Sequence, residues 1–230
     1  MFATTRTIPV KLFAGLMLCL FFLQSTPCFA ENPADSPDVV QERLEKGEVI
    51  CGLETVGKTR FVTGRVLIDQ PPEKIWPVMV NPFEFQQKIS PRMKTVDVTV
   101  DKLHKSVMTV SMDTFPIPDI SYTVESEYTR TEHGARVDFH RIGGTLKDFK
   151  GHWLMNPACH GKKTELVYSM YLDPGFYVPQ WIVRFGVKQE LPKTLLALRK
   201  RVEEVVGNNA MLEKKTILAA TPLHKHHITY

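Results

Sequence analysis

The stretch that decides the fold runs from Lys150 to Val206 and opens with Gly151-His152-Trp153-Leu154-Met155-Asn156-Pro157. In an extended chain successive side chains point to opposite faces, so Trp153 and Met155 share one face. After a turn at residues 160–163, apolar side chains again recur at every second position, at Leu166, Tyr168, Met170 and Leu172. The pattern predicts two neighbouring strands, and Asp173-Pro174-Gly175 ends the second one.

An amphipathic helix is expected after these strands. Beyond Pro179, leucine and valine recur at spacings of three and four residues, at Leu191, Leu195, Leu198, Val202 and Val205. This spacing places the side chains on one stripe of an α-helix. A sheet with one apolar face and a helix with one apolar stripe bury both surfaces when the helix lies across the sheet.

Residues 1–30 have the composition of a secretory signal peptide. Arg6 and Lys11 precede an almost wholly apolar run, and small residues at Cys28 and Ala30 flank a cleavage tripeptide. We therefore expect cleavage near Ala30 and a periplasmic or secreted mature protein. An uncleaved membrane anchor is the alternative, although the apolar run is short for a helix that spans a bilayer.

The composition of the chain argues against a nucleic-acid partner. The formal net charge is +4, and the loss of Arg6 and Lys11 with the leader would lower it to +2. A nucleic-acid-binding domain would need a stronger basic excess gathered on one face. Residues 31–230 suffice for one domain with a substantial core.

The segment that precedes residue 150 shows helical and then extended patterns. Short helices are expected at residues 38–46, near 71–80 and at 83–89, and strands at 48–53, 60–68, 96–100, 107–112, 120–128 and 136–142. Short strands joined by tight turns form an antiparallel meander. We expect residues 31–47 to form a linker with a short helix, residues 48–206 the folded domain, and residues 207–230 a loosely ordered tail.

This order of elements resembles the helix-grip fold of the START and polyketide-cyclase-like superfamily (SRPBCC), which includes Bet v 1 allergens and, as the branch most similar here, coenzyme-Q-binding proteins. The likeness rests on residues 66–76, 151–164 and 173–192, while Asn81-Pro82 departs from the family pattern. It implies an α+β fold, with a curved antiparallel sheet of about seven strands wrapped around a long C-terminal helix and two short helices after the first strand.

Members of this superfamily typically enclose a cavity that holds a lipid, sterol, quinone or other hydrophobic molecule. By this resemblance the candidate ligand-binding residues are Trp153, Met155, Leu166, Tyr168, Met170, Leu195 and Leu198. Methionine suits such a wall because its flexible side chain adapts to irregular apolar shapes. The alternative is a filled core in which these side chains pack only against one another.

Apolar and aromatic residues outside this set are the candidates for a cavity mouth: Phe83, Phe85, Ile89, Phe176, Tyr177 and Trp181. Aromatic side chains at a rim would gate access, or touch a membrane transiently while the ligand is exchanged. The alternative is a lid that is packed shut against the core.

Few residues suggest catalysis or metal binding. Asp138 and His140 share one face of a strand and are the candidates for an acid–base pair, although cross-strand pairs on a solvated face look the same. No nucleophile elbow, phosphate loop or zinc-ligand spacing occurs, so no cofactor or metal is expected. The histidines at 224, 226 and 227 lack the partners that a metal site needs.

The sequence thus predicts an exported monomer that binds a hydrophobic small molecule and carries it between membranes. A cyclase or aromatase enzyme would use the same cavity but would need ionisable groups that point into it. A protein-interaction module with a filled core is the third reading. If the first and last strands of the domain pair antiparallel, Cys159 lies far from Cys51, which argues against a disulfide.

Overall fold

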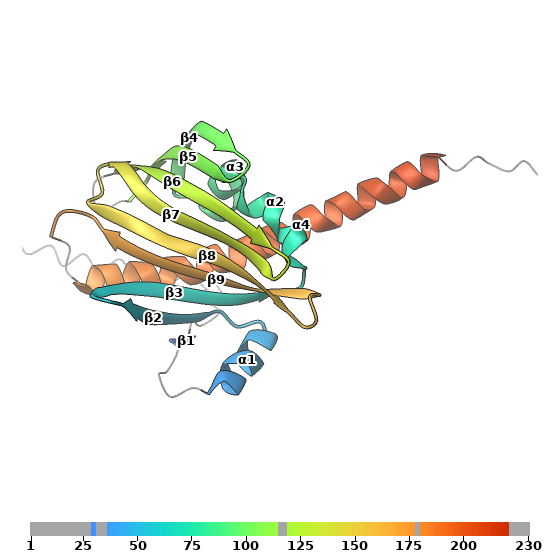
Figure 1. The fold of residues 1–230 in the computed structure, drawn as a ribbon, viewed down its shortest axis with the longest axis horizontal. Helices are drawn as coiled ribbons and strands as arrows, with labels where there is room; N and C mark the ends of the chain where they lie inside the picture. The colour runs from blue at the N-terminus through green and yellow to red at the C-terminus, as the bar shows by residue number, and fades with distance from the viewer. Residues whose placement is uncertain (1–28, 31–35, 115–118, 178–179, 221–230) are drawn as a thin grey trace, which may run out of the picture.

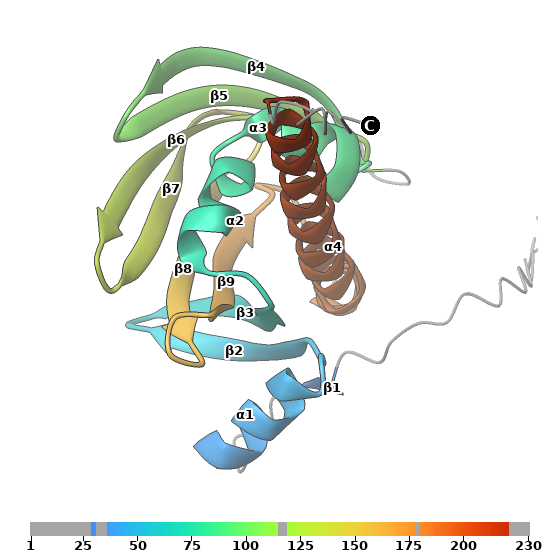
Figure 2. The same ribbon diagram turned by 90° about the vertical axis from the view of Figure 1, so that its right-hand side faces the viewer.

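The computed structural model describes residues 29–30, 36–114, 119–177 and 180–220, with the backbone alone at 29–30, 87, 180–187 and 213–220. The expected signal peptide up to residue 28 and the histidines at 224–227 lie outside these residues. One curved sheet lies across the long helix α4 (Gln180–Ala220), and Figures 1 and 2 show it curled around α4 and the shorter helix α2 (Pro72–Met79).

The sheet has nine strands in the described part of the chain, in the order β1-β2-β3-β9-β8-β7-β6-β5-β4. The strands are β1 (Phe29–Ala30), β2 (Ile50–Val56), β3 (Thr59–Ile68), β4 (Met93–Lys102), β5 (Lys105–Met112), β6 (Ile120–Thr131), β7 (Gly134–Gly144), β8 (Asp148–Ala158) and β9 (Lys163–Asp173). The two-residue strand β1 pairs parallel with β2, and the other neighbours pair antiparallel. This confirms the α+β helix-grip fold, with eight antiparallel strands instead of about seven.

β3 pairs antiparallel with β9 within the sheet, and this register places Cys51 and Cys159 far apart. Ile68 lies opposite Thr164, and Gly64 lies opposite both Cys51 and Tyr168. Cys159 follows β8 at the Ile68 end. Cys51 is buried and Cys159 is exposed.

The second short helix expected at residues 83–89 is two elements. Asn81 Oδ1 accepts a hydrogen bond from Phe83 N and caps α3 (Pro82–Glu84). The chain then widens into a π-helical turn, η1 (Phe85–Ile89), in which Ser90 N donates to Phe85 O at 2.7 Å. A turn of this kind bonds over five residues rather than four, a difference that hydrophobic periodicity does not reveal.

The long helix α4 continues past the expected end of the domain. We expected residues 207–230 to be a loose tail, but α4 runs through Gly207 to Ala220. Glycine ends a helix when it adopts a left-handed conformation, and Gly207 is not among the glycines with positive φ. Figure 1 shows the last turns of α4 projecting away from the sheet. No helix in the described part of the chain combines the length and apolarity of a membrane-spanning segment.

A second, smaller apolar cluster holds α1 (Pro37–Glu45) on the sheet. Val40 and Leu44 of α1 pack with Ile50 and Leu67 of β2 and β3. Arg199 of α4 donates to Gly47 O at 3.0 Å, and therefore links the segment after α1 to the long helix. The helix expected at residues 38–46 is confirmed.

Candidate ligand-binding interior

The inner face of the sheet is the face turned toward α4, and one end of it is tightly packed. Met155, Leu166, Leu195 and Leu198, which are all predicted ligand-binding residues, have an exposed fraction of 0%. They meet Val66, Ile68 and Ile75, which are also fully buried. Side chains sealed on every side by protein stabilise the fold, and they reach a ligand only if the core opens.

The other end of the inner face keeps accessible surface. Tyr168 and Met170 of β9 are half-buried, although both point to the same side of the sheet as Leu166. Met108 and Met112 of β5 are half-buried as well and pack against the same core cluster. The predicted ligand-binding set therefore divides into buried residues and the half-buried Tyr168 and Met170.

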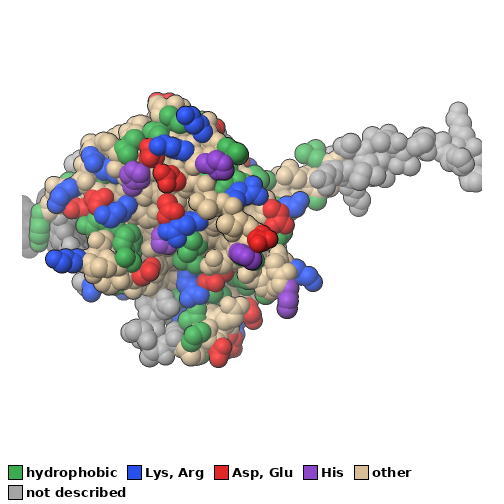
Figure 3. Space-filling view, viewed as in Figure 1, with side chains coloured by type: hydrophobic (Ala, Val, Ile, Leu, Met, Phe, Trp, Pro, Cys, Tyr) green, Lys and Arg blue, Asp and Glu red, His purple; other side chains and the backbone are tan. Residues whose placement is uncertain are grey.

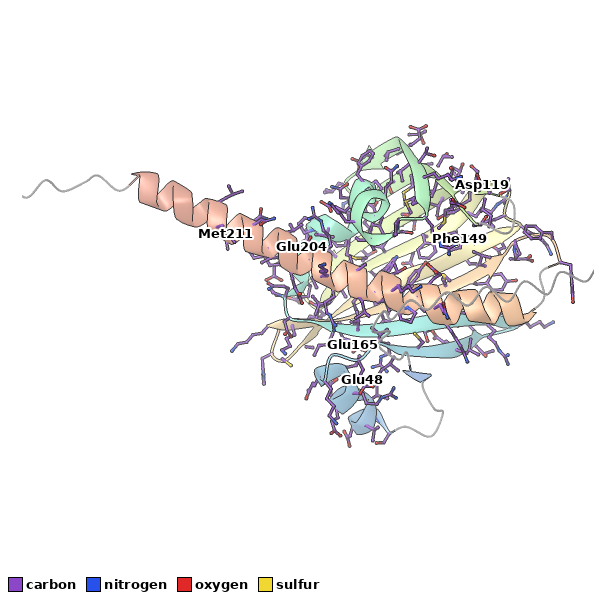
Figure 4. The ribbon with its side chains drawn as sticks, turned by 180° about the vertical axis from the view of Figure 1, so that it is seen from behind. Glu48, Asp119, Phe149, Glu165, Glu204 and Met211 are labelled. Atoms are coloured by element: carbon purple, nitrogen blue, oxygen red, sulfur yellow. The ribbon has the colours of Figure 1, made fainter. Side chains whose placement is uncertain are left out.

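Aromatic rings run across this more open end from strand to strand. Trp153 and Tyr168 stack with centroids 3.8 Å apart and planes 10° apart. Phe139 lies 6.0 Å from Tyr168 and 5.1 Å from Phe149, and Phe149 lies 5.1 Å from Tyr122. Figure 4, which views the molecule from the helix side, shows Phe149 on the face turned toward α4. These rings, stacked on one another or tilted by up to 61°, form an apolar wall on the inner face of the sheet.

Two phenol groups stand within this wall. Burial raises the pKa of Tyr122 to about 12. Burial also raises the pKa of Tyr168, and the nearby Tyr122 phenol raises it further. Both hydroxyl groups therefore stay protonated at physiological pH and act as hydrogen-bond donors, never as bases.

A cavity of about 340 Å³ opens where α2 and α3 face strands β4 and β5. Its walls are Val80, Asn81, Pro82, Phe83, Val98, Asp101, Ser106 and Met108. The volume lies in the range of small-molecule sites, and apolar walls with a few polar groups are their usual composition. Sequence reasoning missed all of these residues except Phe83. The alternation on β5 places Met108 on the inner face, but only the packing of α2 and α3 leaves space beside it.

The predicted mouth residues do not meet at one place. Phe83 is 49% exposed and lines the cavity, whereas Ile89 is buried and the Phe85 ring lies 6.0 Å from Trp153. The exposed Phe176 and Tyr177 lie in the link between β9 and α4. Glu84, the neighbour of Phe83, binds Arg201. Arg201 lies about 30 Å along α4 from its start at Gln180, at a rise of about 1.5 Å per residue. Phe83 therefore lies far from Phe176 and Tyr177, which precede Gln180. The Trp181 side chain lies outside the described residues.

The predicted acid–base pair lies on the outer face of the sheet. Val137 and Phe139 belong to the core, so the alternating Asp138 and His140 point away from α4. Arg136 donates to both carboxylate oxygens of Asp138, at 2.6 Å each. Figure 3 shows charges of both signs and histidines dispersed over this face.

One outer-face histidine is electrostatically perturbed. His152 lies directly opposite Asp138 on one side and Ser169 on the other. Burial, and then the charge of Arg136, lower the pKa of His152. Ser169 Oγ is buried and has no hydrogen-bond partner in the described part of the chain, so Asp138, His152 and Ser169 do not include an exposed nucleophile. Among the described residues no group of His, Cys, Asp and Glu side chains is arranged to hold a metal ion.

Comparison with known proteins gives one family and many structures. Residues 68–199, more than half of the chain, match the family described as polyketide cyclase/dehydrase and lipid transport. No curated protein matches the sequence.

Several solved structures share the fold at low sequence identity. A STAR-related lipid transfer protein from Xanthomonas axonopodis is 17% identical, with a TM-score of 0.56, covering 66% of this chain and 91% of that one. The Zhui aromatase/cyclase from Streptomyces sp. R1128 is 15% identical (TM-score 0.55), covering 64% and 95%. Human STARD10 is 12% identical (TM-score 0.58), covering 82% and 90%.

Proposed function

We propose that this chain, which belongs to the polyketide cyclase/dehydrase and lipid transport family, binds a hydrophobic small molecule between its curved sheet and its helices. The observation that carries the proposal is the cavity of about 340 Å³ beside Met108. Its walls include the inner face of β4 and β5, on the side of the sheet that also holds the half-buried Tyr168 and Met170. A carrier needs such walls and a way in, and Phe83 is a partly exposed residue at this opening.

We further propose that the protein works as a carrier outside the cytoplasm. The basic and then apolar composition of residues 1–30 supports export. One of the structures with this fold is named as a STAR-related lipid transfer protein. A carrier of this kind would take its ligand from one membrane and release it at another.

A cyclase-type enzyme is the second candidate, because one of the structurally similar proteins is an aromatase/cyclase. The protonated phenol of Tyr168 would donate a hydrogen bond to a carbonyl group of such a substrate, whereas Tyr122 Oη already donates to Met112 Sδ. Asp138 and His140 would take no part, since they lie on the outer face. Recovery of a chemically altered product after incubation with a bound ligand would favour the enzyme over the carrier.

The test fills the cavity from within. Met108→Trp would place a large ring in the space beside β5, while Met108→Leu conserves the side-chain volume and serves as the matched control. We expect the tryptophan variant to bind a fluorescent fatty acid at least roughly tenfold more weakly, a change of about 1.4 kcal/mol, and the leucine variant to bind like the wild type. Equal binding by all three folded proteins would exclude this cavity as the site.

The natural ligand is identified by a separate measurement. Native mass spectrometry of the full-length protein, purified from the envelope fraction of its host, would show a co-purifying hydrophobic molecule. A protein that carries no such molecule, and that transfers no fluorescent lipid between donor and acceptor vesicles, would contradict the carrier proposal.

A further inference from the structure

A β-bulge in the edge strand β4 turns Asp101 toward the cavity. Val98 lies opposite Met108 and Asp101 lies opposite Ser106, so three positions along β4 match two along β5. In a regular strand, side chains three positions apart point to opposite faces. The extra residue of the bulge, between Val98 and Val100, cancels this alternation, and both Val98 and Asp101 line the cavity. Bulges re-aim side chains in this way beside functional sites.

The carboxylate of Asp101 is not neutralised by a neighbouring cation. It makes no ion pair or hydrogen bond within the part of the chain that the structure describes. Among the described residues that line the cavity, Asp101 is the only charged one, and most of the others are apolar, such as Val80 and Met108. An unpaired carboxylate beside apolar walls attracts a positively charged group and repels a negatively charged one.

A pair of hydroxyl groups lies beside this carboxylate. Ser106, directly opposite Asp101, is 6% exposed and lines the cavity. Its Oγ shares a hydrogen bond of 2.6 Å with Tyr128 Oη. Burial raises the pKa of Tyr128, and the nearby charge of Asp101 also raises it. Both hydroxyl groups therefore stay uncharged, and their oxygens can accept a hydrogen bond from a ligand.

We propose that the ligand of this cavity is a hydrophobic molecule with a protonated amine, and that Asp101 binds the amine. This inference rests on the proposed function, a hydrophobic ligand between the sheet and the helices. An ammonium group carries three N–H donors and no acceptor, which matches the acceptor oxygens of Asp101 and Ser106. The hydrocarbon part packs against Val98 and Met108. A fatty acid of equal length binds more weakly, because its carboxylate is repelled by Asp101.

The experiment compares three ligands that share a decyl chain and differ in the head group: decylamine, which is protonated at neutral pH, decanol and decanoate. We expect Asp101→Asn to weaken binding of decylamine by roughly three- to fivefold, to strengthen binding of decanoate by a similar factor, and to leave decanol unchanged. The factor is modest because Asp101 is exposed. Titration calorimetry on the full chain gives the dissociation constants. High salt should reduce the preference for the amine, because it screens exposed charges.

Asp97→Asn is the matched control, because it removes the same charge from the same strand. Asp97 precedes the bulge and alternates with Val96, which packs against the core, and with Val98 of the cavity wall, so it points to the outer face. It should change each dissociation constant by less than about twofold. Met108→Trp should weaken binding of all three ligands, since it fills the space that their chains occupy.

The outcomes separate this inference from the proposed function. If the ligands bind but Asp101→Asn leaves the ratios of their dissociation constants unchanged, the cavity takes hydrophobic molecules and Asp101 does not select them. Equal shifts by Asp97→Asn and Asp101→Asn would overturn the inference as well, since they would reveal an effect of net charge. Binding of the fluorescent fatty acid alone would support the hydrophobic cavity and overturn the amine. If none of these molecules binds, both proposals fail.

Discussion

At the scale of single residues, the approach of α4 to the sheet depends on Gly64. A Cβ atom at this position would lie 2.7 Å from Leu195 Cδ1 and 3.0 Å from Leu191 Cδ2. Leu195 is fully buried and Leu191 nearly so, hence neither side chain has free space into which it can move. The absence of a side chain at Gly64 thus sets how closely the helix lies on β3.

Replacement of this glycine tests the close contact. Gly64→Ala should lower the free energy of unfolding by about 1–3 kcal/mol, because one added methyl group overpacks the core. Urea denaturation measures the change. Gly143→Ala is the control, since its Cβ would lie 3.5 Å from Thr123, an ordinary contact, and it should change stability much less. Equal effects of the two substitutions would show that helix packing is not the cause.

At the scale of elements, an ion pair joins α3 to α4. Arg201 Nε lies 2.5 Å from Glu84 Oε2, and Nη2 lies 3.1 Å from Oε1, with 20% of each side chain exposed. The hydrogen bonds from Arg201 hold the pKa of Glu84 below its ordinary value. Because α3 also carries Phe83, the pair fixes one wall of the cavity against the long helix.

The ion pair makes the stability depend on pH in a defined direction. A carboxylate with a lowered pKa stabilises the fold above its ordinary pKa, and that contribution is lost as the pH falls through the lowered value. Glu84→Gln should therefore cost about 1–2 kcal/mol at pH 7 and progressively less below pH 4.5. Denaturation at both pH values measures this.

Glu204→Gln is the control for the Glu84 variant. Glu204 also pairs with Arg201, at 3.3 Å, but it is 45% exposed, so its loss should cost about 0.5 kcal/mol or less. A Glu84→Gln penalty that stays constant with pH would indicate a packing defect instead of a lost charge.

At the scale of the whole molecule, α4 serves two regions. Its middle part supplies Leu191, Leu195, Leu198 and Val202 to the core. From Gly207 to Leu212 its side chains are exposed, and Figure 4 shows Met211 beyond the sheet. Among the described residues, the side chains that α4 packs against the core therefore end close to Val206, whereas the helix itself continues.

Truncation of the chain tests this boundary. A protein that ends at Val206 should unfold within about 0.5 kcal/mol of the full chain, because the side chains of residues 207–212, the described part of the removed segment, are exposed. A protein that ends at Arg201 loses the fully buried Val202 and should be strongly destabilised. Urea denaturation of both measures the difference. A large loss after truncation at Val206 would show that the projecting part of α4 stabilises the domain.

Much of the fold could be predicted because its signals are local. The alternation around Trp153 and Tyr168 gives the strands, and the leucine stripe gives the buried part of α4. The position of the cavity could not be predicted, because Met108 and Met155 have the same inward orientation and differ only in what packs over them. The continuation of α4 past Val206 was missed because the sequence shows no clear apolar period there.

The continuity of α4 has a mechanical consequence. The middle of α4 is held in the core and its last turns project from the sheet, so the projecting part acts as a lever that spans about 20 Å at a rise of about 1.5 Å per residue. A tilt of a few degrees where the helix crosses β3 would displace the free end by an ångström or more. A small shift of α4 on the sheet when the interior binds or releases a ligand would thereby become a larger movement at the C-terminal end of the helix.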